Sequence, residues 1–206
     1  MVAKKLEPST RLRVSEGCCL YYLEKQSTRM PVAEIAAAVG ISERTFYRYF
    51  PVKADSVEPI FDHMTETMNF TVIAGPATDL RRLMIDAFET MFSSRITSRA
   101  AEFFPLIFAD PEIWALFLRK VQEGETSLAP LLAASLGLPA DDNRARAAAA
   151  AVASSTRIAL ERLTSHGADL SVEFTGLLDA FGQQILLPYG SQPDAHTLNL
   201  PVSPPG

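Results

Sequence analysis

The chain has 206 residues, of which 48% are hydrophobic and 21% are charged. This length corresponds to one large domain or two small ones, and the composition excludes a disordered or collagen-like chain. No uncharged apolar run reaches the roughly 18 to 20 residues that a membrane-spanning helix needs. The first residues, MVAKKLEPSTRLRV, are basic but lack an apolar segment behind them, so we expect no secretory signal and a cytoplasmic location.

The sequence is poor in residues that build metal or catalytic sites. Its two cysteines, Cys18 and Cys19, are adjacent, so they cannot form a disulfide framework or a four-ligand metal site; we expect them in the core of the first helix. Three histidines are present, and none belongs to a Glu-x-x-His pair. Phosphate-loop, G-x-S-x-G and dinucleotide-binding motifs are absent. We therefore expect no metal, no cofactor and no enzymatic activity.

Charge divides the chain into two unequal parts. Residues 1–53 carry nine basic and five acidic side chains, a net charge of +4, whereas the remainder carries ten basic and nineteen acidic ones, a net charge of −9. A basic segment on an acidic body indicates that only the N-terminal part meets a polyanion such as DNA. Chance clustering of solvated charge is the alternative, and charge alone does not distinguish the two.

Residues 31–53, PVAEIAAAVGISERTFYRYFPVK, have the pattern of two short helices joined by a tight turn. The apolar face of the first helix consists of Val32, Ile35, Ala36 and Val39. Gly40 then suits the left-handed conformation that turns the chain. Ser42 is predicted to cap the second helix, and Pro51 to close it. This is the layout of a helix-turn-helix unit, whose second helix enters the major groove of DNA.

The second short helix combines an apolar inner face with a polar outer face. Ile41, Phe46 and Phe50 are spaced to point inward. The outward residues are Glu43, Arg44, Thr45, Tyr47, Arg48 and Tyr49. Such a mixture of donors, acceptors and amphipathic rings suits contact with bases and phosphates.

Individual roles follow from side-chain chemistry. Arg44 is predicted to contact guanine, and Thr45 to pack its methyl group on thymine or to bind a phosphate. Tyr47, Tyr49 and Lys53 suit phosphates, although one of the two tyrosines could instead pack on the domain. The remaining alternatives are that Glu43 accepts from cytosine or caps the helix dipole, and that Arg48 binds a phosphate or forms a salt bridge.

Period-3.6 patterning predicts helices throughout the rest of the chain. One helix begins near Lys53 and runs to about Phe70, before the break at Gly75-Pro76. An apolar stripe then predicts a helix with Leu80, Leu83, Met84, Ala87, Phe88, Met91 and Phe92 on one face.

Further helix ends are marked by proline, glycine and aspartate. Pro111 suits the start of a helix, and Asp141, after Gly137-Leu138-Pro139, is a predicted N-cap. Two long helices follow, at about 142–165 and 170–187, and the tail 189–206 is predicted to be disordered. The prediction is an all-α protein of about nine helices, divided into a DNA-binding domain (1–55) and a helical ligand-binding and dimerisation domain (56–188).

The stretch VAEIAAAVGISERTFYRYFPVKADSV resembles the DNA-binding signature of the TetR-like (tetracycline-repressor) transcription regulators. The matching elements are Ile35-Ala36, Gly40-Ile41-Ser42, Thr45-Phe46-Tyr47, Tyr49-Phe50 and Lys53. The match covers about a quarter of the chain. There are departures: Met30 and Pro31 stand where the family usually has threonines, so a side-chain cap is lost, and Gly17-Cys18 and Tyr21-Tyr22 replace an alanine pair and a Leu-Phe pair.

This resemblance implies a homodimeric repressor that a small hydrophobic effector releases from a palindromic DNA operator. It implies DNA contacts by Ala33, Glu43, Arg44, Thr45, Tyr47, Tyr49 and Lys53, and pairing of the two last long helices with those of a second copy. It also implies an apolar ligand pocket, for which the candidate residues are Phe61, Met64, Met68, Phe88, Phe92, Phe104, Phe108, Trp114 and Phe117. Possible polar anchors are His63, Arg81, Arg82 and Arg157. The alternatives are an activator or co-regulator without an inducer, and a helical carrier protein.

Overall fold

The computed structural model describes residues 10–75 and 79–182, and in these residues it contains helices but no β-strand. The α-helices are α1 (Thr10–Lys25), α2 (Val32–Ala38), α3 (Glu43–Tyr49), α4 (Glu58–Ala74), α5 (Leu80–Met91), α6 (Ala100–Phe108), α7 (Pro111–Ser135), α8 (Asn143–His166) and α9 (Leu170–Phe181). Two short 3-10 helices, η1 (Lys53–Ser56) and η3 (Thr97–Arg99), join them. The prediction of an all-α protein with about nine helices is confirmed.

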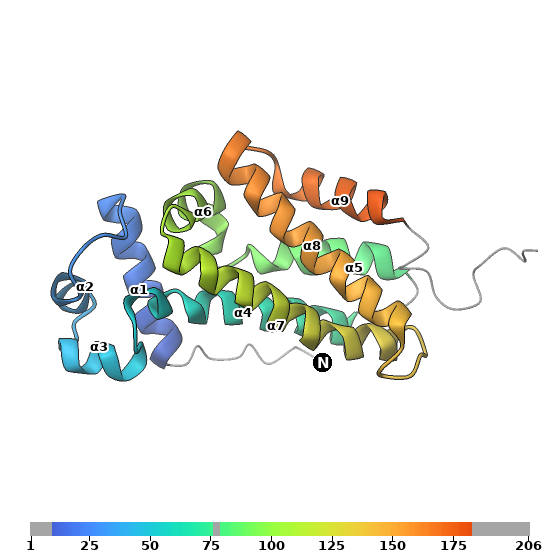
Figure 1. Cartoon of the computed structure of the whole chain (residues 1–206), viewed down its shortest axis with the longest axis horizontal. Coiled ribbons are helices and arrows are strands. Elements are labelled where there is room, and N and C mark those ends of the chain that lie inside the picture. Colours follow the sequence, from blue (N-terminus) through green and yellow to red (C-terminus); the bar gives the residue numbers. More distant parts are fainter. Residues whose placement is uncertain (1–9, 76–78, 183–206) are drawn as a thin grey trace, which may run out of the picture.

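The helices form a small head and a larger body (Figure 1). The head consists of α1, α2 and α3 and lies at one end of the elongated molecule. The body consists of α4 to α9, and its long helices α4, α7 and α8 run lengthwise. Within the body, α7 contacts both α4 and α8, and α9 contacts α8 and α5. Because α4 also contacts α1, it joins the two parts.

The first helix of the head packs closely on the second. A Cβ atom at Gly17 would lie 2.9 Å from Cγ1 of Val39, so glycine permits an approach that the alanine usual in the family would hinder. Cys18 and Cys19 are fully buried in α1, as predicted. Burial raises the pKa of the Cys18 thiol to about 12 and that of Cys19 well above its ordinary value, so both stay protonated and unreactive.

The link between head and body differs from the prediction of one helix starting near Lys53. Residues Lys53–Ser56 form the 3-10 helix η1, and α4 begins only at Glu58. The reason is Pro59, which stands in the first turn of α4. Proline has no backbone N–H to donate, so it suits a helix start and disfavours a helix that runs through it.

Aspartates cap four helices of the body. The carboxylates of Asp79, Asp110, Asp142 and Asp169 each accept a backbone N–H at the start of α5, α7, α8 and α9, respectively. The predicted cap at Asp141 is wrong by one residue, because it is Asp142 that has the extended backbone and accepts from the N–H of Arg144. Pro111 lies in the first turn of α7, as predicted.

The predicted stripe on α5 belongs to the hydrophobic core. The six stripe residues within the helix are buried: Leu80, Leu83, Met84, Ala87, Phe88 and Met91. Phe92, just beyond the helix, is half-buried. Phe88 of this stripe stacks on Phe174 of α9 with ring centroids 3.9 Å apart and planes 3° from parallel. The buried apolar residues of α9, Phe174 and Leu178, therefore pack inside this chain. Val172 and Phe181 are exposed on the same helix.

The last predicted helix is shorter in the described residues than the sequence indicated. α9 ends at Phe181, where Gly182 forms the C-cap. Residues 183–187 of the predicted helix and the tail 189–206 lie outside the described residues. No helix of the described part combines the length and the apolar character needed to cross a membrane.

Candidate DNA-binding interface and effector cavity

The turn before α3 has the predicted geometry. Gly40 has φ of +73°, the left-handed conformation that glycine adopts without strain. Ser42 then caps the helix: its hydroxyl oxygen accepts the N–H of Thr45 at 3.2 Å, and its O–H donates to the Thr45 hydroxyl at 3.0 Å. Phe50, which precedes Pro51, is extended rather than helical, so α3 ends at Tyr49.

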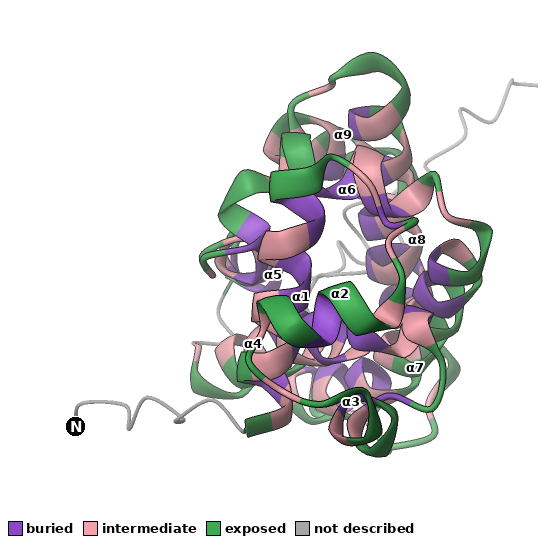
Figure 2. Ribbon diagram, turned by 90° about the vertical axis from the view of Figure 1, so that its left-hand side faces the viewer, coloured by how far each residue is buried: buried purple, intermediate pink, exposed green. Residues whose placement is uncertain are grey.

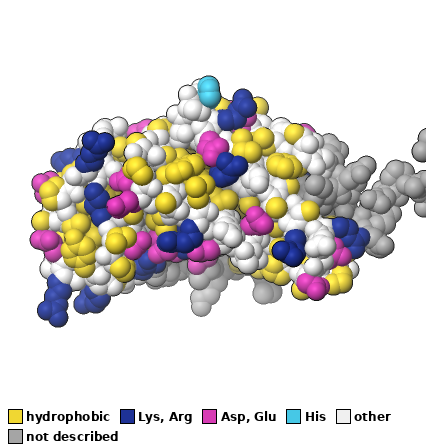
Figure 3. All heavy atoms as spheres, viewed as in Figure 1, with side chains coloured by type: hydrophobic (Ala, Val, Ile, Leu, Met, Phe, Trp, Pro, Cys, Tyr) yellow, Lys and Arg dark blue, Asp and Glu magenta, His cyan; other side chains and the backbone are white. Residues whose placement is uncertain are grey.

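Two phenylalanines anchor α3 to the head. Phe46 and Phe50 are fully buried, and their ring centroids lie 5.2 Å apart in an edge-to-face arrangement. The opposite face of α3 is exposed and carries Glu43, Arg44, Tyr47 and Arg48. Seen from the end of the molecule, exposed parts of α2 and α3 lie on the outside of the head (Figure 2). Basic side chains project from the same end in Figure 3.

The two tyrosines of α3 have different environments. Tyr47 is 49% exposed, so its ring and hydroxyl are accessible. Tyr49 is half-buried: its ring lies 6.1 Å from that of Phe50, and the Arg48 guanidinium lies 5.3 Å from the Tyr49 ring. The environment of Tyr49 agrees with the alternative in which one tyrosine packs on the domain.

The other predicted contact residues surround α3. Ala33 is exposed in the first turn of α2, whereas Thr45 and Lys53 are half-buried. Pro31 is the N-cap of α2 and makes no side-chain cap hydrogen bond, as its difference from the family pattern predicted. The structure thus places the predicted DNA-binding residues on or beside the two short helices of the head.

A charged side chain of α1 contacts the end of α3, the recognition helix of the helix-turn-helix unit. Nε of Arg11 donates to the backbone carbonyl of Tyr49 at 3.3 Å, and the guanidinium lies 5.6 Å from the centre of the Phe50 ring. Nη2 of Arg11 also donates to Oε2 of Glu58 at 2.5 Å. One arginine thereby connects α1, the end of α3 and the first turn of α4.

The same glutamate connects α4 to α7. Nζ of Lys120 lies 3.0 Å from Oε1 of Glu58, 2.9 Å from Oδ1 of Asp62 and 2.8 Å from Oε2 of Glu123. Burial of Glu58 raises its pKa, but hydrogen bonds from Arg11 and Lys120 outweigh this, so its pKa lies below the ordinary value. Burial lowers the pKa of Lys120, but the hydrogen bonds that its ammonium donates to Glu123, Asp62 and Glu58 raise the pKa above its ordinary range. Both groups are therefore charged at neutral pH.

A second connection joins the head to the start of α7. The hydroxyl of Thr28, in the segment between α1 and α2, donates to Oδ2 of Asp110 at 3.0 Å. Asp110 is also the N-cap of α7. A cleft of about 240 Å³ adjoins this hydrogen bond and is lined by residues 26–29, Leu106 and 109–111.

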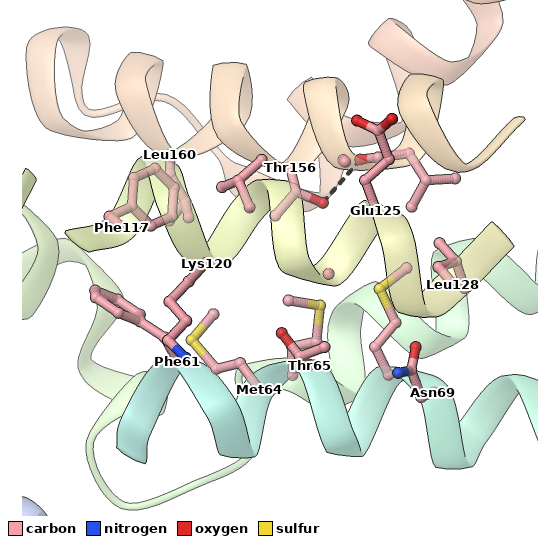
Figure 4. A pocket seen from close by; sticks show the side chains of 16 residues that line it. Phe61, Met64, Thr65, Asn69, Phe117, Lys120, Glu125, Leu128, Thr156 and Leu160 are labelled. Atoms are coloured by element: carbon pink, nitrogen blue, oxygen red, sulfur yellow. Dashed lines mark hydrogen bonds between the residues drawn. The ribbon is translucent and has the colours of Figure 1, made fainter. Parts of the chain in front are cut away.

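A cavity of about 60 Å³ lies between α4, α7 and α8, and Met91 of α5 completes its wall (Figure 4). Its apolar lining includes Phe61, Met64, Met68, Met91, Phe117 and Leu128. Its polar lining consists of Thr65, Asn69, Lys120, Glu125 and Thr156. Ligand pockets commonly enclose about 300 to 1,000 Å³, so a drug-sized ligand requires the wall to move. The methionines suit such a change because their side chains are unbranched and adaptable.

Of the predicted pocket residues, the structure brings four to the cavity: Phe61, Met64, Met68 and Phe117. The other five, Phe88, Phe92, Phe104, Phe108 and Trp114, form a chain of ring contacts beside it. This chain reaches the cavity through Phe108, whose ring lies 4.6 Å from that of Phe117. Contact between these nine residues and a ligand stays a prediction.

The candidate polar anchors lie outside the cavity lining. Arg81 pairs with Asp179 at 2.7 Å, Arg82 with Asp86 at 2.9 Å and Arg157 with Glu161 at 2.6 Å. His63 is half-buried on α4.

Sequence reasoning missed the polar residues that do line the cavity. A search for aromatic and methionine residues passes over them, although Lys120 and Glu125 share the helical spacing of 117, 121, 124 and 128 on α7. In the described ranges, no three His, Cys, Asp or Glu side chains are grouped closely enough to hold a metal ion.

Comparison with known proteins identifies the head. The family model "Bacterial regulatory proteins, tetR family" matches residues 27–58, which span α2, α3 and η1. The nucleoid occlusion factor SlmA of Colwellia psychrerythraea is 34% identical over 65 residues, which are 32% of this chain and 33% of that protein. SlmA of Haemophilus influenzae is 34% identical over 56 residues, which are 27% of this chain and 26% of that protein. The chain thus matches a third or less of these relatives' length.

A solved structure extends the likeness to the body. The crystal structure of a protein from Mesorhizobium loti MAFF303099, assigned to the TetR family of transcriptional regulators, superimposes with a TM-score of 0.53. The superposition covers 83% of this chain and 94% of that one, at 16% sequence identity. At this identity the likeness shows the fold alone. Together, the matches show that the chain carries the N-terminal helix-turn-helix domain of the TetR family of bacterial regulatory proteins on a TetR-like all-helical fold.

Proposed function

We propose that this protein is a homodimeric transcriptional repressor that binds a palindromic DNA operator and releases it when a small apolar ligand occupies the cavity. The observation that carries the proposal is the construction of α3. Phe46 and Phe50 fix the helix to the head, while its exposed face offers Arg44, Tyr47 and Arg48 to solvent. A rigid helix with exposed donors at one end of the molecule suits the major groove.

In this proposal, some side chains of α3 contact the DNA bases and others contact the DNA phosphates. Arg44, near the helix start, reads guanine, since a guanidinium fits its O6 and N7 atoms. Tyr47 and Arg48 bind phosphates and set the register, together with Lys53 at the start of η1. Tyr49 supports the helix more than it contacts DNA, because its ring is half-buried.

The neighbouring residues complete this interface. Thr45 contacts a thymine methyl group or a phosphate, while its N–H stays bonded to Ser42. Glu43 accepts from cytosine or stabilises the start of the helix. Ala33 lies on the exposed side of α2, at the edge of the interface.

Dimerisation then takes place through α8 and α9, at the surface they leave uncovered. The buried faces of both helices pack inside the chain, so a second copy must use their outer faces. On α9 this face includes Val172, which is 70% exposed, and Gly176 and Ala180 four and eight residues later. Small residues at this spacing permit two helices to approach closely, and two-fold symmetry then fixes the spacing of the DNA half-sites.

Ligand release requires the cavity and the head to be coupled. The ion pairs Lys120–Glu58 and Glu58–Arg11 join the cavity wall to the end of α3. A ligand that displaces α4 or α7 disturbs this chain of contacts and therefore the position of the head. An effect on DNA arises only if the ligand prefers the conformation that cannot span both half-sites.

Selection of genomic DNA fragments by the purified protein tests the proposal. The native chain is compared with Arg44→Ala, and with Arg95→Ala as a control that removes an exposed arginine of the body. We expect enrichment of a two-fold symmetric site by the native and control proteins and loss of that enrichment in Arg44→Ala. Weak, salt-sensitive binding without a preferred site by all three proteins would contradict it. An operator complex that no ligand weakens would instead favour an activator or co-regulator without an inducer.

A further inference from the structure

We infer that the cavity between α4, α7 and α8 takes an apolar molecule with one positive charge, whose cationic group pairs with the carboxylate of Glu125. This inference rests on the proposed function, since it assigns the chemical class of the effector. The cavity wall is mostly apolar, with two phenylalanines and three methionines among its residues. The ligand must therefore have an apolar body, and the charged residues of the wall decide its polar group.

Of the two charged side chains in the lining, Lys120 is already neutralised. Its Nζ lies within 3.0 Å of carboxylate oxygens of Glu58, Asp62 and Glu123. An ammonium has three N–H donors, and each of these carboxylates occupies one. An anionic ligand at Lys120 would have to displace a carboxylate and would be repelled by the others. The structure thus disfavours an apolar acid.

Glu125 is the other charged residue of the lining, and it differs from Lys120 in lacking a partner. No cation or hydrogen-bond donor pairs with its side chain in the described part of the chain. The side chain is half-buried and projects from α7 on the side of α8 (Figure 4). An unpaired carboxylate at the wall of an apolar cavity favours a cation, because the ion pair forms where water is partly excluded.

The net charge of the body supports the same sign of charge. Phe61 and Phe117, whose rings lie 5.5 Å apart, add apolar surface for the body of the ligand. Residues 54–206 carry nineteen acidic and ten basic side chains, so the field of the body also concentrates cations near it. By contrast, a neutral ligand would leave Glu125 unpaired.

Direct binding measurements test this inference without DNA. The chain has one tryptophan, Trp114, whose ring lies 5.5 Å from that of the cavity residue Phe117. Its fluorescence therefore reports occupation of the cavity. The probes are 4-phenylbutylamine, 4-phenylbutanol and 4-phenylbutyrate, which share one apolar frame and differ in charge. Thermal unfolding with each compound gives an independent measure of binding.

We expect the amine to bind about tenfold more tightly than the alcohol and the acid, the size of effect that a charge-assisted hydrogen bond produces. In Glu125→Gln this preference should disappear. Glu66→Gln serves as the control, because Glu66 carries the same charge on α4 but is exposed and does not line the cavity. It should retain the preference.

Equal binding of the three compounds, preference for the acid, failure of the amine to bind, or an amine preference that persists in Glu125→Gln would each overturn the inference. The comparison of the three compounds in the native protein stands even if Glu125→Gln does not fold. Because the ligand measurements contain no DNA, a negative result in them does not bear on the proposed operator binding. Likewise, a negative operator selection does not bear on the proposed ligand class.

Discussion

Nη2 of Arg11 and Oε2 of Glu58 lie 2.5 Å apart, and this ion pair joins the first helix of the head to the first turn of α4. Arg11 also donates to the carbonyl of Tyr49, and Glu58 also accepts from Lys120. The end of the recognition helix and a wall residue of the cavity are thus three contacts apart. The head cannot change its angle to α4 without altering the surroundings of Glu58.

Arg11→Ala should therefore lower both stability and DNA affinity. The side chains of Arg11 and Glu58 are 36% and 19% exposed, so the pair is intermediate between a surface and a buried ion pair. We expect a loss of about 1 to 2 kcal/mol in the free energy of unfolding. Arg13→Ala is the control, because Arg13 is exposed on the same helix and donates to Thr10. Urea unfolding of both variants measures the effect, and equal losses in the two would refute the role assigned to Arg11.

Acid should weaken the contact between head and body. The pKa of Glu58 in the folded protein lies below its ordinary value of 4.5. A carboxylate with a lowered folded-state pKa contributes stability above its unfolded-state pKa, and this stability is lost as the pH falls through the folded-state pKa. Asp142, whose pKa is lowered to about 2 by hydrogen bonds from the side chain and backbone of Arg144, acts in the same direction.

Melting temperatures measured between about pH 8 and pH 3 test the expectation for Glu58. We expect little change down to about pH 5 and a decline below it. In Glu58→Gln the decline should be smaller, since glutamine does not titrate, although the variant starts from a lower stability at neutral pH. A decline of the same size in both proteins would show that Glu58 does not contribute.

Ser42→Ala should destabilise the recognition helix without changing its exposed face. The hydroxyl of Ser42 accepts the N–H of Thr45 at 3.2 Å, and losing such a cap costs about 0.5 to 2 kcal/mol. DNA affinity should fall for all sequences alike, because no base contact is removed. Ser42→Asp, which restores an acceptor, should recover the free energy of unfolding. A variant Ser42→Ala as stable as the native chain would contradict the capping role.

The position of α9 should depend on Phe174 far more than on Phe181. Phe174 is fully buried and stacks on Phe88, whereas Phe181, near the end of the same helix, is 44% exposed. Phe174→Ala should cost about 3 to 5 kcal/mol, and it should also weaken the dimer, since α9 belongs to the proposed interface. Phe181→Ala should change the unfolding free energy by less than about 1 kcal/mol. Equilibrium unfolding and sedimentation of the two variants measure both effects.

The helices of the head could be predicted because the residues that determine them are close together in the sequence. Gly40, Ser42 and Pro51 each determine the backbone within a few residues, and the spacing of Phe46 and Phe50 identifies the inner face of α3. The stripe on α5 was predictable for the same reason. By contrast, the predicted start near Lys53 is too early, because Pro59 favours a helix that begins beside it.

The cavity was less predictable because it depends on packing between distant segments. Phe88 and Phe117 look alike in the sequence, but one stacks on α9 and the other lines the cavity. Lys120 and Glu125 lie on the same helix, and only the tertiary structure shows that Lys120 pairs with Glu58 while Glu125 has no partner among the described residues. Similarly, spacing alone did not show that Phe174 of α9 packs against Phe88 inside this chain.

The affinity ratio between a selected operator and a scrambled duplex tests most directly whether α3 reads a DNA sequence. Measured at two salt concentrations, this ratio separates base recognition from attraction to phosphates. We predict a large ratio for the native protein and for Arg95→Ala, and a ratio at least about tenfold smaller for Arg44→Ala, the effect of losing a guanine contact. Equal affinity of the native protein for the two duplexes would contradict sequence recognition by α3. A ratio unchanged in Arg44→Ala would also contradict it.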